Sequence, residues 1–198
     1  KGLFADKRSD FIIPDYQRPY AWGENECQTL WDDIFTFAIP DGDKDKFNKD
    51  DEYYLGPIVT FKNENGKQEI IDGQQRLTTL MLLLRAFYKR SGQMRDNQTL
   101  SMRKMIAQSI WKTNEFDEPD LNELKIDSEV ATDEDKGEFL EILKEGTAES
   151  RYKSRYAENY RFFERKIDGF LKDYPSYFPY LPTRILSNCI LLPIEAEN

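Results

Sequence analysis

The sequence predicts an α/β fold in which a small mixed sheet with helices comes first and a helical extension follows. Short apolar runs bounded by turn residues occur at 10–14, 53–61 and 67–71, and this pattern is typical of strands. Apolar residues repeat every three or four positions from residue 24 and again from residue 75, which is typical of helices. Further helical spacing fills the second half of the chain.

The first elements combine one short strand, an extended segment and a helix. Residues 10–14 (DFIIP) read as a strand that its proline ends. Residues 16–22 (YQRPYAW) are expected to be extended, because the residue before Pro19 is disfavoured in the α region. A helix should begin at Glu24, since apolar residues then recur at helical spacing. Residues 41–52 form a charged loop.

Two strands and a long helix follow. We predict a β-hairpin with strands at 53–61 and 67–71, because the NENG sequence between them is a turn signal. The next helix is expected over 75–90, with its apolar stripe facing a core and Gly92 ending it.

The second half is expected to be mainly helical. Aromatic residues recur at spacings of three and four between Tyr152 and Phe170, a pattern that favours core packing over a platform for stacking bases. CILLPI at the end reads as a last strand. We predict a nucleotide-binding core at 1–92 and an extension at 93–198 packed on the same domain. The helices expected in that extension span 99–113, 133–145, 151–172 and 176–188.

Composition excludes several kinds of chemistry. The chain of 198 residues contains no histidine, so it has neither a Ser-His-Asp triad nor an HNH nuclease centre. Its two cysteines cannot complete a zinc site, and we expect both to be buried free thiols in a reducing cytoplasm. The groups that remain available for binding or catalysis are carboxylates, amides, Arg, Lys and Tyr, with or without a hard cation such as Mg²⁺.

We expect a cytoplasmic protein without a membrane partner, because no apolar run approaches the length that crosses a bilayer. The chain starts at Lys1 and not at Met, so we expect it to be trimmed.

Charge is unevenly distributed around a net value of −9. Residues 114–145 hold 13 acids and 3 bases, whereas residues 76–104 hold seven bases and one acid and residues 150–172 hold seven bases and three acids. Two basic stretches could form a positive face that binds DNA. The alternative is that they are ordinary solvated helix faces.

The sequence DGQQR, at the junction of a strand and a helix, is the first candidate site. A helix N-terminus presents unpaired N–H groups to an anion, and Gly73 would let a phosphate approach the main chain. Arg76 offers a planar fork for phosphate oxygens, and Gln74 or Gln75 could orient a water molecule. Asp72 could hold Mg²⁺.

The alternative for DGQQR is a capping box with Asp72 as N-cap and Gln75 reaching back to it. Capping does not explain Arg76, because a cation in the first turn opposes the helix dipole unless an anion lies there.

The sequence YQRPYAW is the second candidate site. A base could stack on Tyr16, Tyr20 or Trp22 while Arg18 meets a phosphate. The alternative is an arm whose aromatic residues fill the core and whose arginine pairs with an acid.

The two candidate sites together resemble one bacterial family. FIIPDYQRPYAW (11–22), YYLGPIVTF (53–61) and EIIDGQQRLTTLMLLLRAF (69–87) are similar to segments of the N-terminal domain of GmrSD-type modification-dependent restriction enzymes. AENYRFF (157–163) is a looser match in the second half.

The resemblance implies a ParB/sulfiredoxin-like fold and an NTPase, using GTP or ATP with Mg²⁺, that gates DNA cleavage in phage defence. It implies that Asp72, Gly73, Gln74, Gln75 and Arg76 form the nucleotide site, with Asp72 on the metal. Tyr16, Gln17, Arg18, Tyr20 and Trp22 would line or brace that site. The nuclease would lie in a separate C-terminal HNH-type domain or subunit, and DNA would bind through the full-length protein.

Two other functions remain open from the sequence. The chain could be a DNA-binding or modification-sensing module that turns over no nucleotide. It could also be a regulatory or toxin–antitoxin partner domain with a vestigial site.

Overall fold

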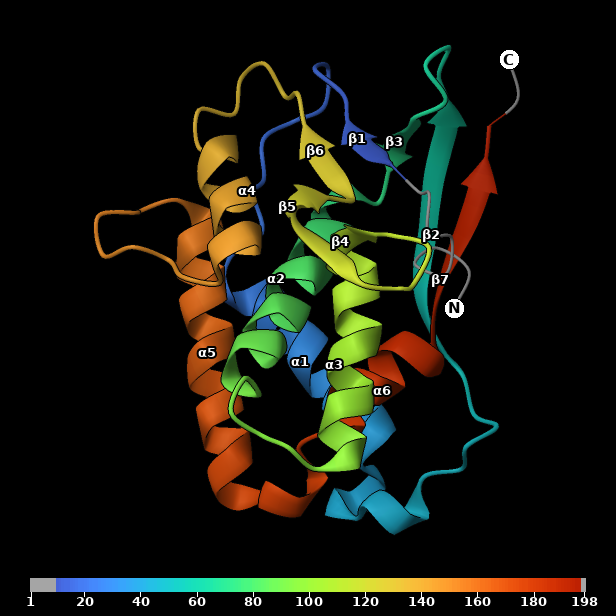
Figure 1. Ribbon diagram of the computed structural model, residues 1–198, viewed down its shortest axis with the longest axis vertical. Helices are drawn as coiled ribbons and strands as arrows, with labels where there is room; N and C mark the ends of the chain where they lie inside the picture. Colours follow the sequence, from blue (N-terminus) through green and yellow to red (C-terminus); the bar gives the residue numbers. More distant parts are fainter. Residues whose placement is uncertain (1–9, 197–198) are drawn as a thin grey trace.

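A five-stranded mixed sheet forms one side of the computed structural model, which describes residues 10–196 (Figure 1). The strand order is β6-β1-β3-β2-β7. β1 pairs in parallel with β3 and β6, β7 pairs in parallel with β2, and β2 and β3 are antiparallel. The predicted α/β fold with a small mixed sheet is therefore confirmed. Lys1, on which the expectation of a trimmed chain rests, lies outside the described residues. The strands of this sheet are β1 (Phe11–Ile13), β2 (Tyr53–Lys62), β3 (Gln68–Asp72), β6 (Ile126–Ser128) and β7 (Cys189–Glu195).

The predicted hairpin is confirmed as β2 and β3. Its turn is held by Asn63, whose side-chain oxygen accepts hydrogen bonds from the backbone N–H groups of Asn65 and Lys67, both at 3.0 Å. Gly66 supplies the positive φ of 79° that the turn requires. The hairpin register places Asp72, the last residue of β3, opposite Val59 of β2.

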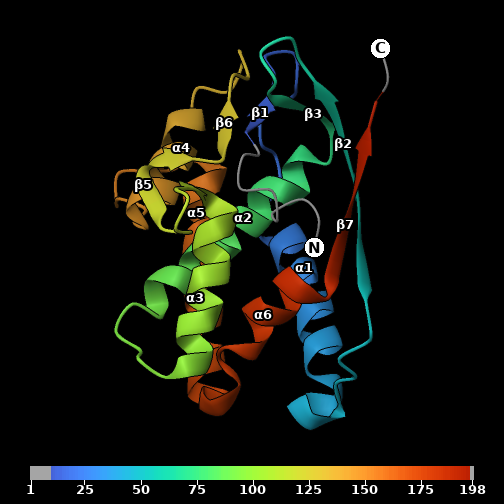
Figure 2. The same cartoon turned by 45° about the vertical axis from the view of Figure 1, so that its right-hand side comes forward.

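The helices lie on one side of β2 and β7 (Figure 2). α2 is central, and α3, α4 and α5 pack around it. Its run LMLLL is buried throughout, because a helix enclosed by others needs apolar residues on all its faces. The helices are α1 (Glu24–Ala38), α2 (Gln74–Arg90), α3 (Asn97–Ile110), α4 (Lys136–Glu145), α5 (Arg155–Asp173) and α6 (Tyr180–Ser187).

The aromatic stripe of α5 is core, as predicted. Tyr156, Tyr160, Phe163 and Phe170 are all buried. α5 begins later than predicted because Ser154 is its N-cap and accepts a hydrogen bond from the Ala157 N–H. These rings are therefore not a surface on which bases could stack.

The second half contains three strands that the sequence analysis did not predict. The helix expected over 99–113 ends at Ile110, because β4 (Trp111–Thr113) turns back to pair with β5 (Pro119–Leu124). β6 then joins the main sheet beside β1. β4 and β6 have three residues each, which is too short for a strand pattern, and β5 is mostly polar and starts with proline.

Other elements begin or end a few residues away from their predicted boundaries. The helix predicted over 133–145 begins at Lys136. The helix predicted over 176–188 is a 3₁₀ turn at Pro175–Tyr177 followed by α6. The charged loop overlaps two 3₁₀ turns, Pro40–Gly42 and Lys44–Lys46.

The structure bears on two predictions that were made from composition. Cys27 and Cys189 are both buried and free, as expected. Within residues 10–196, no helix combines the length and the apolar character that crossing a membrane requires.

Candidate functional site

The start of α2 has no side-chain cap. Gly73 is the N-cap residue, with φ 91° and ψ 6°, and the first backbone bond of the helix runs from the Leu77 N–H to the Gly73 carbonyl at 3.0 Å. Asp72 ends β3 and is exposed. The capping-box interpretation is therefore wrong. No side chain among residues 10–196 accepts a hydrogen bond from the first N–H groups of α2, and such free N–H groups are the arrangement that receives an anion.

Gly73 is required by packing as well as by its backbone angle. A Cβ at this position would lie 2.5 Å from Cδ1 of Ile58 and 2.8 Å from the Pro57 carbonyl oxygen. The space that a side chain would need is thus occupied by β2. The backbone angle and the contact with β2 thus explain the glycine on their own, and the approach of a phosphate stays a prediction.

Arg76 lies against the backbone of β2 at Gly56. A Cβ on Gly56 would be 2.5 Å from Nη1 of Arg76, and Gly56 has a φ of 122°. The guanidinium donates one long hydrogen bond, 3.4 Å, to the Pro57 carbonyl. No carboxylate among the described residues forms an ion pair with Arg76. Within residues 10–196, this half-buried cation in the first turn of α2 therefore has no ion-pair partner.

The two glutamines of DGQQR hold the segment 16–22, called the arm below. Gln75 accepts a hydrogen bond from the Ala21 N–H at 2.8 Å and donates one to the Pro19 carbonyl at 3.2 Å. Gln74 donates to the side-chain oxygen of Gln17 at 2.9 Å. Gln17 in turn donates to the Ile71 carbonyl at 2.8 Å. The arm is thus attached to α2 and to the end of β3 through amide groups.

A directed chain of hydrogen bonds connects α5 with the arm and α2. The Thr79 hydroxyl donates to the Gln75 carbonyl at 2.8 Å, so the Tyr20 hydroxyl must donate to Thr79 Oγ1, 2.6 Å away. Asn159 then donates to the Tyr20 oxygen at 2.8 Å and also to the Trp22 carbonyl at 2.9 Å. Burial raises the pKa of Tyr20 well above its usual range, so its hydroxyl keeps the proton that this chain requires.

Asp133, in the acid-rich stretch 114–145, holds the arm in place. It is buried and accepts a hydrogen bond from the Tyr156 hydroxyl at 2.6 Å and a longer one from the Tyr20 N–H at 3.4 Å. The rings of Tyr20 and Tyr156 stack with their centroids 4.6 Å apart. Asn159 and Asp133 are site residues that the sequence analysis missed, because their partners lie more than a hundred residues away.

The remaining arm residues are more accessible. Tyr16 is 65% exposed, Arg18 is exposed and Trp22 is half-buried. The side chains of Arg18 and Asp72 form no hydrogen bond or ion pair with another described residue. The alternative of a purely structural arm therefore fits Tyr20 and does not fit Arg18.

A pocket of about 240 Å³ brings Arg76 and Trp22 together. Its wall combines one face of α1 with the start of β2. Burial and the nearby Asp33 carboxylate raise the pKa of Tyr53. The sequence analysis missed these α1 residues, although positions 26, 29, 30 and 33 share one helix face. The lining residues are Trp22, Glu26, Thr29, Leu30, Asp33, Tyr53, Tyr54, Leu55 and Arg76.

No cluster of metal ligands accompanies this pocket. Across residues 10–196, no three His, Cys, Asp or Glu side chains are grouped so that they could hold an ion. A magnesium ion that a nucleotide carries in needs only one or two protein carboxylates, because phosphates and water complete its shell. Asp72 alone is compatible with that donor set.

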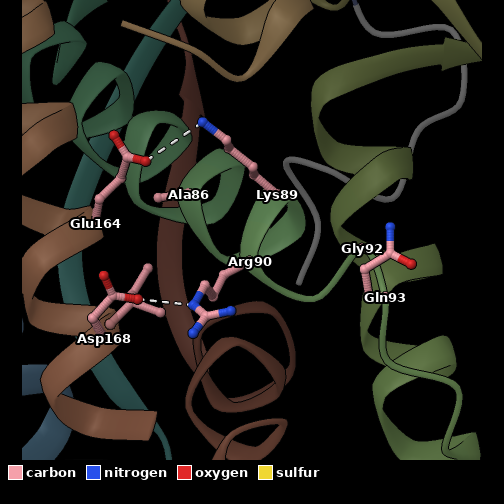
Figure 3. A pocket seen from close by; sticks show the side chains of 8 residues that line it. Ala86, Lys89, Arg90, Gly92, Gln93, Glu164 and Asp168 are labelled. Carbon is pink, nitrogen blue, oxygen red and sulfur yellow. Dashed lines mark hydrogen bonds and ion pairs between the residues drawn. The ribbon is translucent and has the colours of Figure 1, made fainter.

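Another pocket, of about 400 Å³, lies between the end of α2 and α5 and contains none of the predicted residues (Figure 3). Its charged groups neutralise one another. Lys89 pairs with Glu164 at 3.6 Å and Arg90 pairs with Asp168 at 2.8 Å. This pocket therefore offers no free charge to a ligand.

Comparison with known proteins agrees with the motifs. The family model of the GmrSD restriction endonuclease N-terminal domain matches residues 1–198. No curated protein matches the chain.

Proposed function

The chain belongs to the family of GmrSD restriction endonuclease N-terminal domains, so its role lies in restriction and phage defence, and we propose that within that role it binds a nucleoside triphosphate at the start of α2 and hydrolyses it with Mg²⁺. The observation that carries the proposal is the uncapped start of α2 beside Arg76, a cation without a carboxylate partner in the described chain.

The phosphates lie at the start of α2 in this proposal. The backbone N–H groups after Gly73 bind oxygens, and Arg76 stabilises the negative charge that develops as a phosphoryl group is transferred. Arg18, which has no partner among the described residues, is the second cation at the site. Asp72 would hold Mg²⁺, and the ion would supply positive charge to the phosphates there.

The base and sugar occupy the pocket between α1 and β2. Glu26 and Asp33 give its lining a negative charge that disfavours phosphate, and Arg76 is the one cation that lines the same pocket. Trp22 and Tyr54 offer aromatic surface to a base. Tyr54 is 58% exposed, so it is available for such a contact.

The glutamines position the arm in this proposal. The side chains of Gln74 and Gln75 already form hydrogen bonds with Gln17, Ala21 and Pro19. Gln75 therefore acts by fixing the arm, and Gln74 keeps its amide oxygen and one amide N–H for water. This refines the role that the sequence analysis gave them.

A direct DNA-binding role has less support from the basic stretches. Arg85 is buried and donates to the Leu143 carbonyl at the end of α4, at 2.8 Å. Arg103 stacks on Tyr88 at 3.8 Å. Lys89 and Arg90 are paired with acids of α5. We propose that DNA is engaged through the full-length protein, with a nuclease domain or subunit of the HNH type.

The proposal is tested by melting the protein with GTP or ATP, with and without Mg²⁺, alongside phosphate-release assays. Nucleotide should raise the melting temperature of the parent and of an Arg165→Ala variant, whose arginine is exposed on α5. An Arg76→Ala variant should lose that shift. If neither nucleotide stabilises the parent, the proposed site is wrong.

A further inference from the structure

A pocket of about 340 Å³ between the start of α3 and α6 lies apart from every motif described above. Its volume is within the range of small-molecule sites. Arg184 is its one charged lining residue, and no acid lines it. The lining residues are Asn97, Gln98, Ser101, Pro179, Tyr180, Thr183 and Arg184.

The guanidinium of Arg184 is fixed in place but has no counter-charge. It lies over the ring of Phe47 at 4.0 Å from the ring centroid, which holds its plane. Its Nε is buried and has no hydrogen-bond partner. Within residues 10–196, no carboxylate forms an ion pair with it. Burial accordingly lowers the pKa of Arg184. A partly buried cation without a carboxylate partner is stabilised by an anion that binds its accessible N–H groups.

Neutral hydrogen-bonding groups line the same pocket, and Asn97, Gln98 and Ser101 are exposed. The side chains of Asn97, Gln98, Ser101 and Tyr180 form no hydrogen bond with any other residue of the described chain. The Thr183 hydroxyl is already engaged, since it donates to the Pro179 carbonyl at 2.7 Å. Asp96, which precedes the pocket, directs its carboxylate to the Thr99 N–H at 2.9 Å.

We propose that this pocket binds the phosphate group of a small phosphorylated molecule. The two Nη groups of Arg184 bind two phosphate oxygens as a fork, and the amides of Asn97 and Gln98 and the Ser101 hydroxyl donate to the others. Tyr180 and Pro179 form the wall for the organic part of the ligand. The contrast with the pocket of Figure 3 supports this choice, because there each cation is already paired with an acid.

The test follows the Arg184 Nε–Hε signal by ¹⁵N–¹H NMR while inorganic phosphate, and then a nucleoside monophosphate, is added at constant ionic strength. We expect a saturable shift of that signal and of the Asn97 and Gln98 side-chain amides. The same shift should occur in an Arg76→Ala variant, so the result does not depend on the site at α2.

Variants separate binding from folding. Arg184→Gln should weaken phosphate binding at least about tenfold, since hydrogen bonds to charged groups contribute about 1.5–3 kcal/mol. Ser101→Asp, at an exposed position of α3, should abolish binding by repulsion without disturbing the fold. Arg165→Gln, which removes one exposed arginine on α5, should bind like the parent.

Three results would overturn the proposal. The first is an absence of saturable shifts. The second is an equal response to chloride. The third is unchanged phosphate affinity in Ser101→Asp.

Discussion

The guanidinium of Arg76 in α2 lies against the backbone of Gly56 in β2, so closely that a Cβ on Gly56 would be 2.5 Å from Nη1 of Arg76. The glycine of LGPIV and the arginine of DGQQR are thus in direct contact, although the two motifs lie on different elements. The bulge in β2 between Tyr54 and Gly56 lies at the same place. This contact determines where the cation of DGQQR can act.

Replacing Gly56 by alanine should therefore displace Arg76. The Gly66→Ala variant is a matched control, because Gly66 also has positive φ but has nothing within 4 Å of its Cβ position. Each variant should lose about 1–2 kcal/mol of stability from backbone strain, measured by urea unfolding. Only Gly56→Ala should also lose nucleotide affinity. Equal nucleotide affinity in the two variants would show that the position of Arg76 does not matter.

Replacing Gln75 by methionine should release the arm. The variant removes both hydrogen bonds to Ala21 and Pro19, and we expect a loss of about 1–3 kcal/mol in the free energy of unfolding. Hydrogen exchange at the Ala21 N–H should become faster. Gln93→Met, at an exposed position, should change neither quantity. Unchanged exchange at Ala21 in Gln75→Met would contradict the bracing role.

Tyr20 and Asn159 should be energetically coupled. In a double-mutant cycle, Tyr20→Phe and Asn159→Ala should show a coupling free energy of about 0.5–3 kcal/mol, because the two side chains share a hydrogen bond. Tyr160→Phe is the control partner, since the Tyr160 hydroxyl bonds to the Gly146 carbonyl and not to Tyr20. Additive effects in the Tyr20–Asn159 cycle would remove Asn159 from the hydrogen-bond chain.

Stability should fall at alkaline pH because of the buried thiols. Burial raises the pKa of Cys27 from 9.0 to about 12, so above pH 9 the unfolded chain loses the proton that the folded protein keeps. The free energy of unfolding contributed by this group is therefore constant below pH 9 and decreases between pH 9 and about 12. Urea midpoints across this range should fall less steeply in Cys27→Ala. Identical slopes in the two proteins would contradict the assignment.

Local patterns predicted the front of the fold well. The hairpin, α1 and the start of α2 follow from turn residues and from apolar spacing, which are properties of neighbouring residues. The strands β4 and β6 do not, because each has three residues, which is too few to show a strand pattern, and β6 is also held by a partner distant in sequence. β6, for example, pairs with β1 more than a hundred residues earlier.

The candidate site, like the fold, could be predicted from the sequence only in part. DGQQR and YQRPYAW were identified from the sequence, and the structure joins them through Gln74 and Gln75. The role of each residue could not be predicted from the sequence, because it depends on the residues that its side chain contacts in the fold. Gly73 is explained by contact with Ile58, and Asn159 by contact with Tyr20. No spacing rule reveals either contact.

The central claim is that nucleotide phosphates bind at the uncapped start of α2 beside Arg76. Isothermal titration of a non-hydrolysable triphosphate with Mg²⁺ into the parent, Arg76→Ala and Arg165→Ala tests it most directly. The account predicts equal Kd values for the parent and Arg165→Ala, and a Kd at least about tenfold higher for Arg76→Ala. Equal affinity in all three proteins, or no binding by the parent, would contradict it.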